Sequence, residues 1–319
     1  MNTMTTPPSA IVFAYHDVGV RCLRVLLDAG VRVPLVVTHR DDPAENIWFA
    51  SVAEVAAEQG LRCVAPMDPN APEFLASALD QAVRPDFLFS FYYRHMLKAS
   101  WLAAPRLGAF NLHGSLLPQY RGRAPVNWAV IHGERETGAT LHVMNEKPDN
   151  GAIVDQCAVP ILSDDSAREV FDKVVVAAEI VLARSLPRLV DGSARFTPQD
   201  LTRGRYFGGR RPEDGRIPDE ANARQIHDLV RALAPPYPGA FMQLNGQRVV
   251  IERTQHAPAP SGATGRGLRL LSDGSALWLV TAGGGALRVL AARLQGDAAA
   301  LDAHRFESRF STRCLAADA

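Results

Sequence analysis

Three polar residues in the middle of the chain carry the side chains that acyl transfer to an amine requires. Asn111 and His113 stand two residues apart, and Asp149 lies downstream in the segment Lys147-Pro-Asp-Asn-Gly151. When an amine attacks a carbonyl carbon, the oxygen collects negative charge and the nitrogen must lose a proton. An amide N–H can hold the oxyanion, an imidazole can pass protons, and a carboxylate beside the imidazole favours its charged form and fixes its orientation. We therefore predict that these three residues form an active site.

The residues around the pair predict where it lies. Leu107–Phe110 has the pattern of a short buried strand, and in an extended chain residues two apart share a face. Asn111 and His113 are therefore expected to point the same way. Because Gly114 and Pro118 end the strand, the pair is expected at its C-terminal end, where open α/β sheets bind their ligands.

Strand-like and helical patterns alternate in the first part of the chain. The expected strands are 10–15, 33–37, 61–65 and 86–91, and the expected helices are 20–29, 48–59, 71–82, 125–132 and one that follows the capping box Ser166–Glu169. This βαβα order predicts an α/β domain with a Rossmann-like, mostly parallel sheet. The turn after the first strand lacks the GxGxxG pattern, so the sequence does not favour a nicotinamide cofactor. No nucleophile elbow is present, and Ser115 is expected to shape a loop.

The composition changes after Gly192, through the Gly/Arg/Pro-rich segment Gly204–Pro218. We place the domain boundary there, with a catalytic domain at 1–205 and a C-terminal domain at 206–319. A helical pattern over 221–233 precedes five short expected strands, at 241–244, 247–252, 267–271, 276–281 and 286–291. Such strands, separated by turns, are expected to close into a small β-barrel.

Composition narrows the class of protein. The 319 residues have a formal net charge of zero, with 47% hydrophobic and 21% charged residues, which is typical of a globular enzyme. The absence of a basic excess disfavours nucleic acid as a partner, and no apolar run is long enough to insert into a membrane. Four scattered cysteines and no leader pattern at the N-terminus predict a cytoplasmic protein. No metal is expected, since His16, His39, His132 and His142 are scattered and are expected to be structural or solvent-facing.

The run from Asn111 to Gly122, with Asp149 downstream, resembles the folate-dependent formyltransferases. The resemblance implies an N-formyltransferase that uses 10-formyltetrahydrofolate as the formyl donor, without a metal, and an OB-like fold for the C-terminal barrel. It also implies Asn111 as the transition-state stabiliser, His113 as the proton donor and Asp149 as the residue that tunes His113. The family's acceptors include glycinamide ribonucleotide, methionyl-tRNA and amino sugars of sugar nucleotides.

Three further segments resemble the formyltransferase half of the bifunctional polymyxin-resistance enzymes. These are Phe13–Asp17, Phe89–His95 and Tyr120–Trp128. The resemblance implies a nucleotide sugar, UDP-4-amino-4-deoxy-L-arabinose, as the acceptor, and a role in lipid A modification. It also implies folate contacts by His95, Met96, Leu97, Arg123, Asn145, Glu146, Lys147, Pro148 and Asp149. The chain departs from those relatives at Asn145–Pro148, where they have a basic, alanine-containing loop.

Other functions remain open at this stage. Methionyl-tRNA formyltransferase is the main alternative, but its relatives carry a Gly-rich, basic loop where this chain has Arg40–Asn46. A 10-formyltetrahydrofolate hydrolase and a non-catalytic folate or nucleotide sensor are the others, and a homo-oligomer is left open. Arg94, Arg121 and Arg123 are expected at the surface unless a glutamate tail or a nucleotide diphosphate binds them.

Overall fold

The computed structural model describes residues 7–80, 84–261, 263 and 267–318, which divide into two compact units. The first unit comprises the chain up to Pro125 together with Glu136–Val159 and Asp172–Gly208. The second comprises Val126–Arg135, Pro160–Phe171 and the chain from Gly209 onward. Among the described residues, no helix has both the length and the apolar composition needed to cross a membrane.

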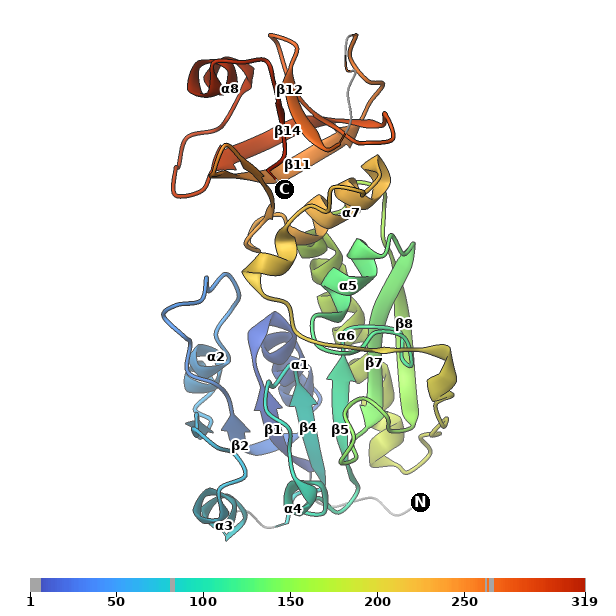
Figure 1. The fold of residues 1–319 in the computed structure, drawn as a ribbon. Helices are drawn as coiled ribbons and strands as arrows, with labels where there is room; N and C mark the ends of the chain where they lie inside the picture. The colour runs from blue at the N-terminus through green and yellow to red at the C-terminus, as the bar shows by residue number, and fades with distance from the viewer. Residues whose placement is uncertain (1–6, 81–83, 262, 264–266, 319) are drawn as a thin grey trace. The chain divides into compact units, whose positions relative to one another are not determined.

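The first unit is built on a seven-stranded sheet with the order β3-β2-β1-β4-β5-β7-β8 (Figure 1). The strands are β1 (Ser9–Ala14), β2 (Arg32–Val37), β3 (Cys63–Val64), β4 (Phe87–Phe91), β5 (Gly108–His113), β7 (Glu136–Val143) and β8 (Ile153–Pro160). The first five are parallel, and β7 runs antiparallel to β5. The prediction of a Rossmann-like, mostly parallel sheet is therefore confirmed. A separate two-stranded sheet joins β6 (Arg121–Gly122) to β9 (Tyr206–Phe207).

Within the described part of the first 190 residues six α-helices begin. They are α1 (His16–Asp28), α2 (Val52–Glu58), α3 (Pro72–Asp80), α4 (Ala99–Leu102), α5 (Pro125–Ile131) and α6 (Ala167–Val190). α4 was not predicted, and α1 and α2 begin at other residues than predicted. α1 begins directly after β1, four residues before the expected start. α2 begins later than expected because the Ser51 side chain accepts the Glu54 N–H at 3.3 Å and caps the helix. Residues 81 and 82 of the predicted helix 71–82 lie outside the described ranges.

The central strands are buried on both faces, as a parallel sheet requires. On one face Ile11 and Phe13 of β1 pack with Trp101 of α4, and Phe74 of α3 packs against the same cluster. On the other face α1 packs on β1, β2 and β4. An ion pair between Arg21 and Glu179 joins α1 to α6 on that side (Figure 1). The sheet is therefore a rigid platform whose strand ends can carry a site.

The second unit contains a curled, six-stranded antiparallel sheet with the order β10-β11-β14-β13-β12-β15. Its elements are α7 (Ala223–Leu233), β10 (Ala240–Leu244), β11 (Gln247–His256), β12 (Arg269–Ser272), β13 (Leu277–Val280), β14 (Ala286–Leu294), α8 (Ala303–Phe310) and β15 (Cys314–Ala316). The Asp318 N–H donates to the Gln243 carbonyl at 2.9 Å, so the chain after β15 returns to β10 at the opposite edge. The five predicted strands are confirmed as an antiparallel half-barrel, whereas α8 and β15 were not predicted. Two short 3₁₀ helices, at Leu201–Arg203 and Pro212–Gly215, lie between α6 and α7.

Candidate active site

Strand β5 carries both Asn111 and His113, and it extends to His113 at its carboxyl end. β7 lies beside it, so that Asn111 pairs with His142 and His113 pairs with Thr140. The strand then ends in a tight loop that Ser115 shapes, because its hydroxyl donates to the Gln119 carbonyl at 2.6 Å. The loop-shaping role predicted for Ser115 is therefore confirmed.

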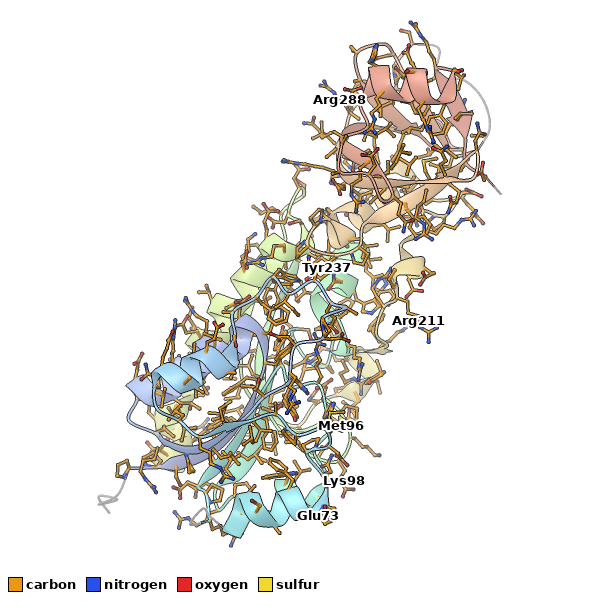
Figure 2. The ribbon with its side chains drawn as sticks, turned by 90° about the vertical axis from the view of Figure 1, so that its left-hand side faces the viewer. Glu73, Met96, Lys98, Arg211, Tyr237 and Arg288 are labelled. Atoms are coloured by element: carbon orange, nitrogen blue, oxygen red, sulfur yellow. The ribbon has the colours of Figure 1, made fainter. Side chains whose placement is uncertain are left out.

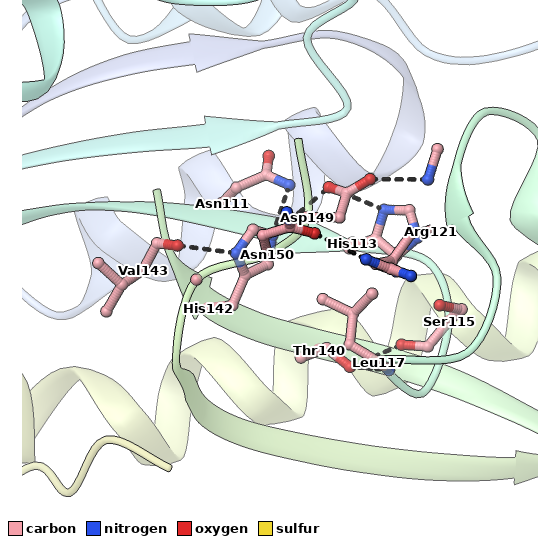
Figure 3. Close-up of polar contacts among 12 residues, drawn as sticks. Asn111, His113, Ser115, Leu117, Arg121, Thr140, His142, Val143, Asp149 and Asn150 are labelled. Carbon is pink, nitrogen blue, oxygen red and sulfur yellow. Dashed lines mark hydrogen bonds and ion pairs between the residues drawn. The ribbon is translucent and has the colours of Figure 1, made fainter. Parts of the chain in front are cut away.

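His113 and Asp149 face each other in a largely buried position (Figure 3). His113 Nδ1 lies 3.5 Å from Asp149 Oδ1, and the two side chains are 7% and 12% exposed. His113 Nε2 lies 2.8 Å from the Tyr120 carbonyl, which can only accept a hydrogen bond. Both ring nitrogens thus face oxygen acceptors. An imidazole with a proton on each nitrogen matches this arrangement, so the geometry suits a residue that carries positive charge during a reaction.

The Asp149 carboxylate is held in place from its other side as well. The Gly122 N–H donates to Asp149 Oδ2 at 2.8 Å. Burial by itself would raise the pKa of Asp149, but positive charge on His113, the contact with the His142 ring and the Gly122 N–H hold that pKa well below its usual range. Asp149 is therefore a fixed negative charge beside His113 at neutral pH.

His142 belongs to this site, which corrects the expectation that it is only structural or solvent-facing. Its ring is 3% exposed, and Nε2 lies 3.1 Å from Asn111 Nδ2 and 3.6 Å from Asp149 Oδ1. Its other nitrogen, Nδ1, lies 2.9 Å from the Val143 carbonyl. The neutral ring therefore donates from Nδ1 and can accept from the Asn111 amide, which fixes the orientation of that amide. His142 was missed because strand β7 was not predicted.

The turn that presents Asp149 is strained and is clamped by two distant side chains. Asp149 has a φ of +55°, which is uncommon for a residue other than glycine. Gln199 Nε2 donates to the carbonyls of Asp149 and Gly151 at 3.0 and 2.6 Å. Arg121 donates to the Asn150 side chain at 2.9 Å (Figure 3). These hydrogen bonds hold the turn in the conformation that places Asp149 against His113.

The segment from Thr197 to Phe207 is tied to the same loops. The Arg123 N–H donates to the Phe207 carbonyl at 2.9 Å, beside the β6–β9 pairing. A side chain on Gly122, which has a φ of +99°, would meet that carbonyl at 2.1 Å. Glycine is therefore required where β6 approaches β9. Gln199 lies in the segment from Thr197 to Phe207, and the sequence patterns did not reveal that this segment contacts the site.

The structure separates the predicted folate contacts into three loops. Met96 is 52% exposed (Figure 2), and Leu97 is 3% exposed and packs in the core with Tyr93. The Leu97 side chain is therefore part of the core and is not free to contact a ligand. Met144 packs against the same cluster, which brings the loop of His95 toward the loop after β7.

The other predicted folate contacts lie in the loop after β7 and at the end of β6. Residues Asn145, Glu146, Lys147 and Pro148 connect β7 to Asp149, and the Lys147 N–H donates to Asn145 Oδ1 at 2.9 Å. Arg123 is exposed at the end of β6, one residue from the Gly122 N–H that contacts Asp149. Among the described residues, no group of three or more His, Cys, Asp and Glu side chains is arranged to hold a metal ion.

Two further strand ends beside the pair carry strained residues. His16 follows β1 with a φ of +69°, and Tyr92 follows β4 with a φ of +58°. The Tyr92 hydroxyl packs so closely on Gly114 that a side chain there would meet it at 1.8 Å. Backbone conformations of this kind concentrate at functional sites, and both residues lie near Asn111 and His113 along the carboxyl edge of the sheet.

Two family models match the chain and together span most of its length. The model described as formyl transferase matches residues 22–186, and the model described as formyl transferase, C-terminal domain, matches residues 210–309. The first contains strand β5 with Asn111 and His113 and the turn with Asp149, and the second contains the curled antiparallel sheet.

Solved structures share the fold at low sequence identity. An N-formyltransferase from Helicobacter canadensis, solved with folinic acid and dTDP-3-aminofucose, is 18% identical with a TM-score of 0.67, over 89% of this chain and 99% of that chain. WlaRD, a sugar 3N-formyltransferase solved with dTDP and 5-N-formyl-THF, is 17% identical with a TM-score of 0.66, over 92% and 99% of the two chains. A sugar N-formyltransferase from Shewanella sp. FDAARGOS_354 is 21% identical with a TM-score of 0.61, over 77% and 96%.

Proposed function

The chain belongs to the formyl transferase family and is a formyltransferase, and from this premise we propose that it formylates the amine of a sugar nucleotide. The formyl donor in this proposal is 10-formyltetrahydrofolate, and the preferred acceptor is UDP-4-amino-4-deoxy-L-arabinose. The observation that carries the proposal is the buried contact of His113 with Asp149 beside the Asn111 amide. Relatives whose structures were solved with folates and with a dTDP-linked amino sugar support the choice of donor and acceptor class.

The reaction requires only that the protein stabilise charge and move protons. The neutral sugar amine attacks the formyl carbon, a C–N bond forms, and the carbonyl electron pair moves onto oxygen. The Asn111 amide and a protonated His113 stabilise that oxyanion, for which one preorganised donor contributes about 3 kcal/mol. The attacking nitrogen then loses a proton, the bond between the formyl carbon and the folate nitrogen breaks, and that nitrogen takes up a proton. Asp149 orients His113 and stabilises positive charge on its ring during the reaction.

The folate contacts extend this proposal to the loops around the site. We assign them to His95, Met96, Leu97, Arg123 and the segment from Asn145 to Asp149. Within this set Leu97 would act through its backbone, because its side chain is buried. No metal takes part in the proposed reaction.

The wider role follows from the acceptor. Formylation of UDP-4-amino-4-deoxy-L-arabinose would place the enzyme in lipid A modification and polymyxin resistance, in the cytoplasm. We further propose 1–205 as the catalytic domain and 206–319 as the OB-like C-terminal domain.

The experiment that tests the function compares acceptors with one donor. Purified protein is mixed with 10-formyltetrahydrofolate and, in separate reactions, UDP-4-amino-4-deoxy-L-arabinose, dTDP-3-aminofucose or methionyl-tRNA, while tetrahydrofolate and formylated product are followed. We expect formylation of the UDP-linked sugar. Formylation of the dTDP-linked sugar alone would show that the acceptor is a different sugar nucleotide from the one proposed. Formylation of methionyl-tRNA alone would overturn the assignment of a sugar acceptor. Folate turnover without any amine would identify a hydrolase instead.

A further inference from the structure

A cavity of about 500 Å³ opens at the carboxyl ends of β1, β2 and β3, on the side of the sheet away from His113. Its walls include Thr38 and Asp41 after β2, Ser51 and Ala53 at the start of α2, and Cys63 and Val64 of β3. A mixture of apolar walls and a few polar groups, in a cavity of this size, is typical of a small-molecule site. None of these residues has a role in the formyl transfer described above.

The order of the strands places this cavity within reach of the proposed catalytic residues. From β1 the chain proceeds outward to β2 and β3, and it then returns to β4 and β5 on the opposite side. Open α/β sheets bind ligands at this point of reversal, which here lies between β1 and β4. Since neighbouring strands are about 4.8 Å apart, β2 lies about 14 Å from β5. A ligand as long as a sugar nucleotide can span that distance along the edge of the sheet.

Arg94 lies two residues after the strained Tyr92, and its backbone N–H donates at 3.0 Å to Nε2 of His39, which lines the cavity. Its guanidinium stacks over the Tyr15 ring at 4.8 Å, and Tyr15 itself lines the cavity. The two terminal nitrogens of Arg94 hold Glu45 in a bidentate pair, with distances of 2.7 and 2.9 Å. The side chains of Arg94 and Glu45 are 43% and 40% exposed, so water reaches the pair. The fork of a guanidinium fits two phosphate oxygens as well as it fits a carboxylate.

The loop that carries Glu45 is anchored on both sides of it. Ahead of Glu45, the Tyr15 hydroxyl donates to Asp41 Oδ1 at 2.7 Å. Beyond it, the Ala50 N–H donates to Asp17 Oδ1 at 2.9 Å. Glu45 can therefore leave Arg94 without detachment of the whole loop from the sheet.

We propose that this cavity binds the nucleoside of the acceptor and that Arg94 binds its diphosphate, displacing Glu45. The inference rests on the proposed function, because it supplies the binding site for the sugar nucleotide. Glu45 then acts as a built-in competitor that neutralises Arg94 in the absence of substrate. The sugar amine would extend from the diphosphate toward Asn111 and His113.

The test measures the binding of UDP and of dTDP by isothermal titration calorimetry, with no folate present. Glu45→Gln removes the competing charge, so we expect it to tighten nucleoside diphosphate binding about threefold to tenfold. Arg94→Ala is expected to weaken binding by about tenfold or more. Ala53→Trp fills the cavity from an exposed helix position, and we expect it to abolish binding. Glu58→Gln, the same charge change at an exposed position of α2, serves as the control and is expected to leave binding unchanged.

Tighter binding by Glu45→Gln together with weaker binding by Arg94→Ala is the result that supports the proposal. Equal binding by all five proteins, weaker binding by Glu45→Gln, or no binding of either nucleotide would overturn it. A parallel titration with 5-formyltetrahydrofolate checks that Ala53→Trp remains folded. If Arg94→Ala weakened only the folate, Arg94 would serve the glutamate tail and the assignment would be wrong. The variants could show the expected pattern of nucleotide binding while no amino sugar is formylated. That result would support this binding site and overturn the proposed function.

Discussion

The two halves of the sheet's carboxyl edge are held together in different ways. Around β5 and β7, the side chains of His113, His142 and Asp149 are 7%, 3% and 12% exposed, and backbone groups bind each of them. Around β1 and β2, the exposed Arg94–Glu45 pair fastens the loop that borders the cavity. An exposed ion pair contributes only about 0–1 kcal/mol, whereas a buried group that loses its partner costs several times more. The first half is therefore suited to fixed geometry and the second to exchange of partners.

The largest effect is expected from Asp149→Asn. This change removes the negative charge beside His113 but keeps an oxygen that can accept from the Gly122 N–H. We expect kcat for formyl transfer to fall about a thousandfold, because His113 loses the negative charge that orients it and stabilises positive charge on its ring during proton transfer. The KM for the acceptor should change little. Steady-state kinetics with tetrahydrofolate release as the signal would measure both, and an unchanged kcat would exclude Asp149 from the mechanism.

A smaller loss is expected from Asn111→Ala, which removes one proposed oxyanion donor and leaves the His113–Asp149 contact intact. The expected fall in kcat is about a hundredfold. Circular dichroism of the variant checks the fold, and single-turnover rates at saturating substrates isolate the chemical step. A rate within twofold of the wild type would show that the Asn111 amide does not stabilise the transition state.

Gln199→Ala tests whether the strained turn at Asp149 depends on its clamp. Loss of the two hydrogen bonds to the Asp149 and Gly151 carbonyls should lower kcat about tenfold, with the acceptor KM unchanged, because a small displacement of a catalytic group costs rate. Gln199→Glu is the matched control: it keeps the size but replaces the N–H donors with carboxylate oxygens, and it should lose as much. Full activity of Gln199→Glu would show that these hydrogen bonds do not hold the turn in its active conformation.

The smallest expected effect is a change in the free energy of unfolding that arises from His39, in the region around β1 and β2. Burial, with help from positive charge on His95 and Arg94, lowers the pKa of His39 to about 4. His39 Nε2 accepts the Arg94 N–H at 3.0 Å, which requires the neutral ring. The unfolded ring binds a proton near pH 6.5 and the folded ring only near pH 4, so stability should fall as the pH decreases through that window.

Because the ring is only half-buried, the loss assigned to His39 is expected to be about 1 kcal/mol. Urea unfolding of the wild type and of His39→Gln at pH 7 and pH 5 measures it. The wild type should lose more stability than the variant on acidification. Equal losses in the two proteins would show that His39 does not cause the loss of stability at low pH.

The sequence predicted the elements whose signals are local. Strands β1, β2 and β4, the capping box at Ser166 and the alternating turns and strands of the second unit all follow from short patterns of apolar, turn and capping residues. β5 was predicted together with the orientation of Asn111 and His113, because the period of a strand is two.

The parts that were missed depend on distant partners. Nearly every residue of β7 is buried, so it shows no alternation, and its role follows only from pairing with β5. That is why His142 was not placed in the site. Gln199 reaches Asp149 across 50 residues, in a segment without strand or helix periodicity. The strain at Asp149, His16 and Tyr92 likewise arises from packing around each turn, which no local pattern encodes.

The two halves of the site are proposed to perform separate tasks, and steady-state formylation by three proteins tests this division. Wild type, Asp149→Asn and Arg94→Ala are assayed with 10-formyltetrahydrofolate and UDP-4-amino-4-deoxy-L-arabinose at several concentrations. We expect Asp149→Asn to lose kcat with the acceptor KM nearly unchanged, and Arg94→Ala to raise the acceptor KM about tenfold with kcat nearly unchanged. Parallel loss of kcat in both variants, or an unchanged KM in Arg94→Ala, would contradict the separation.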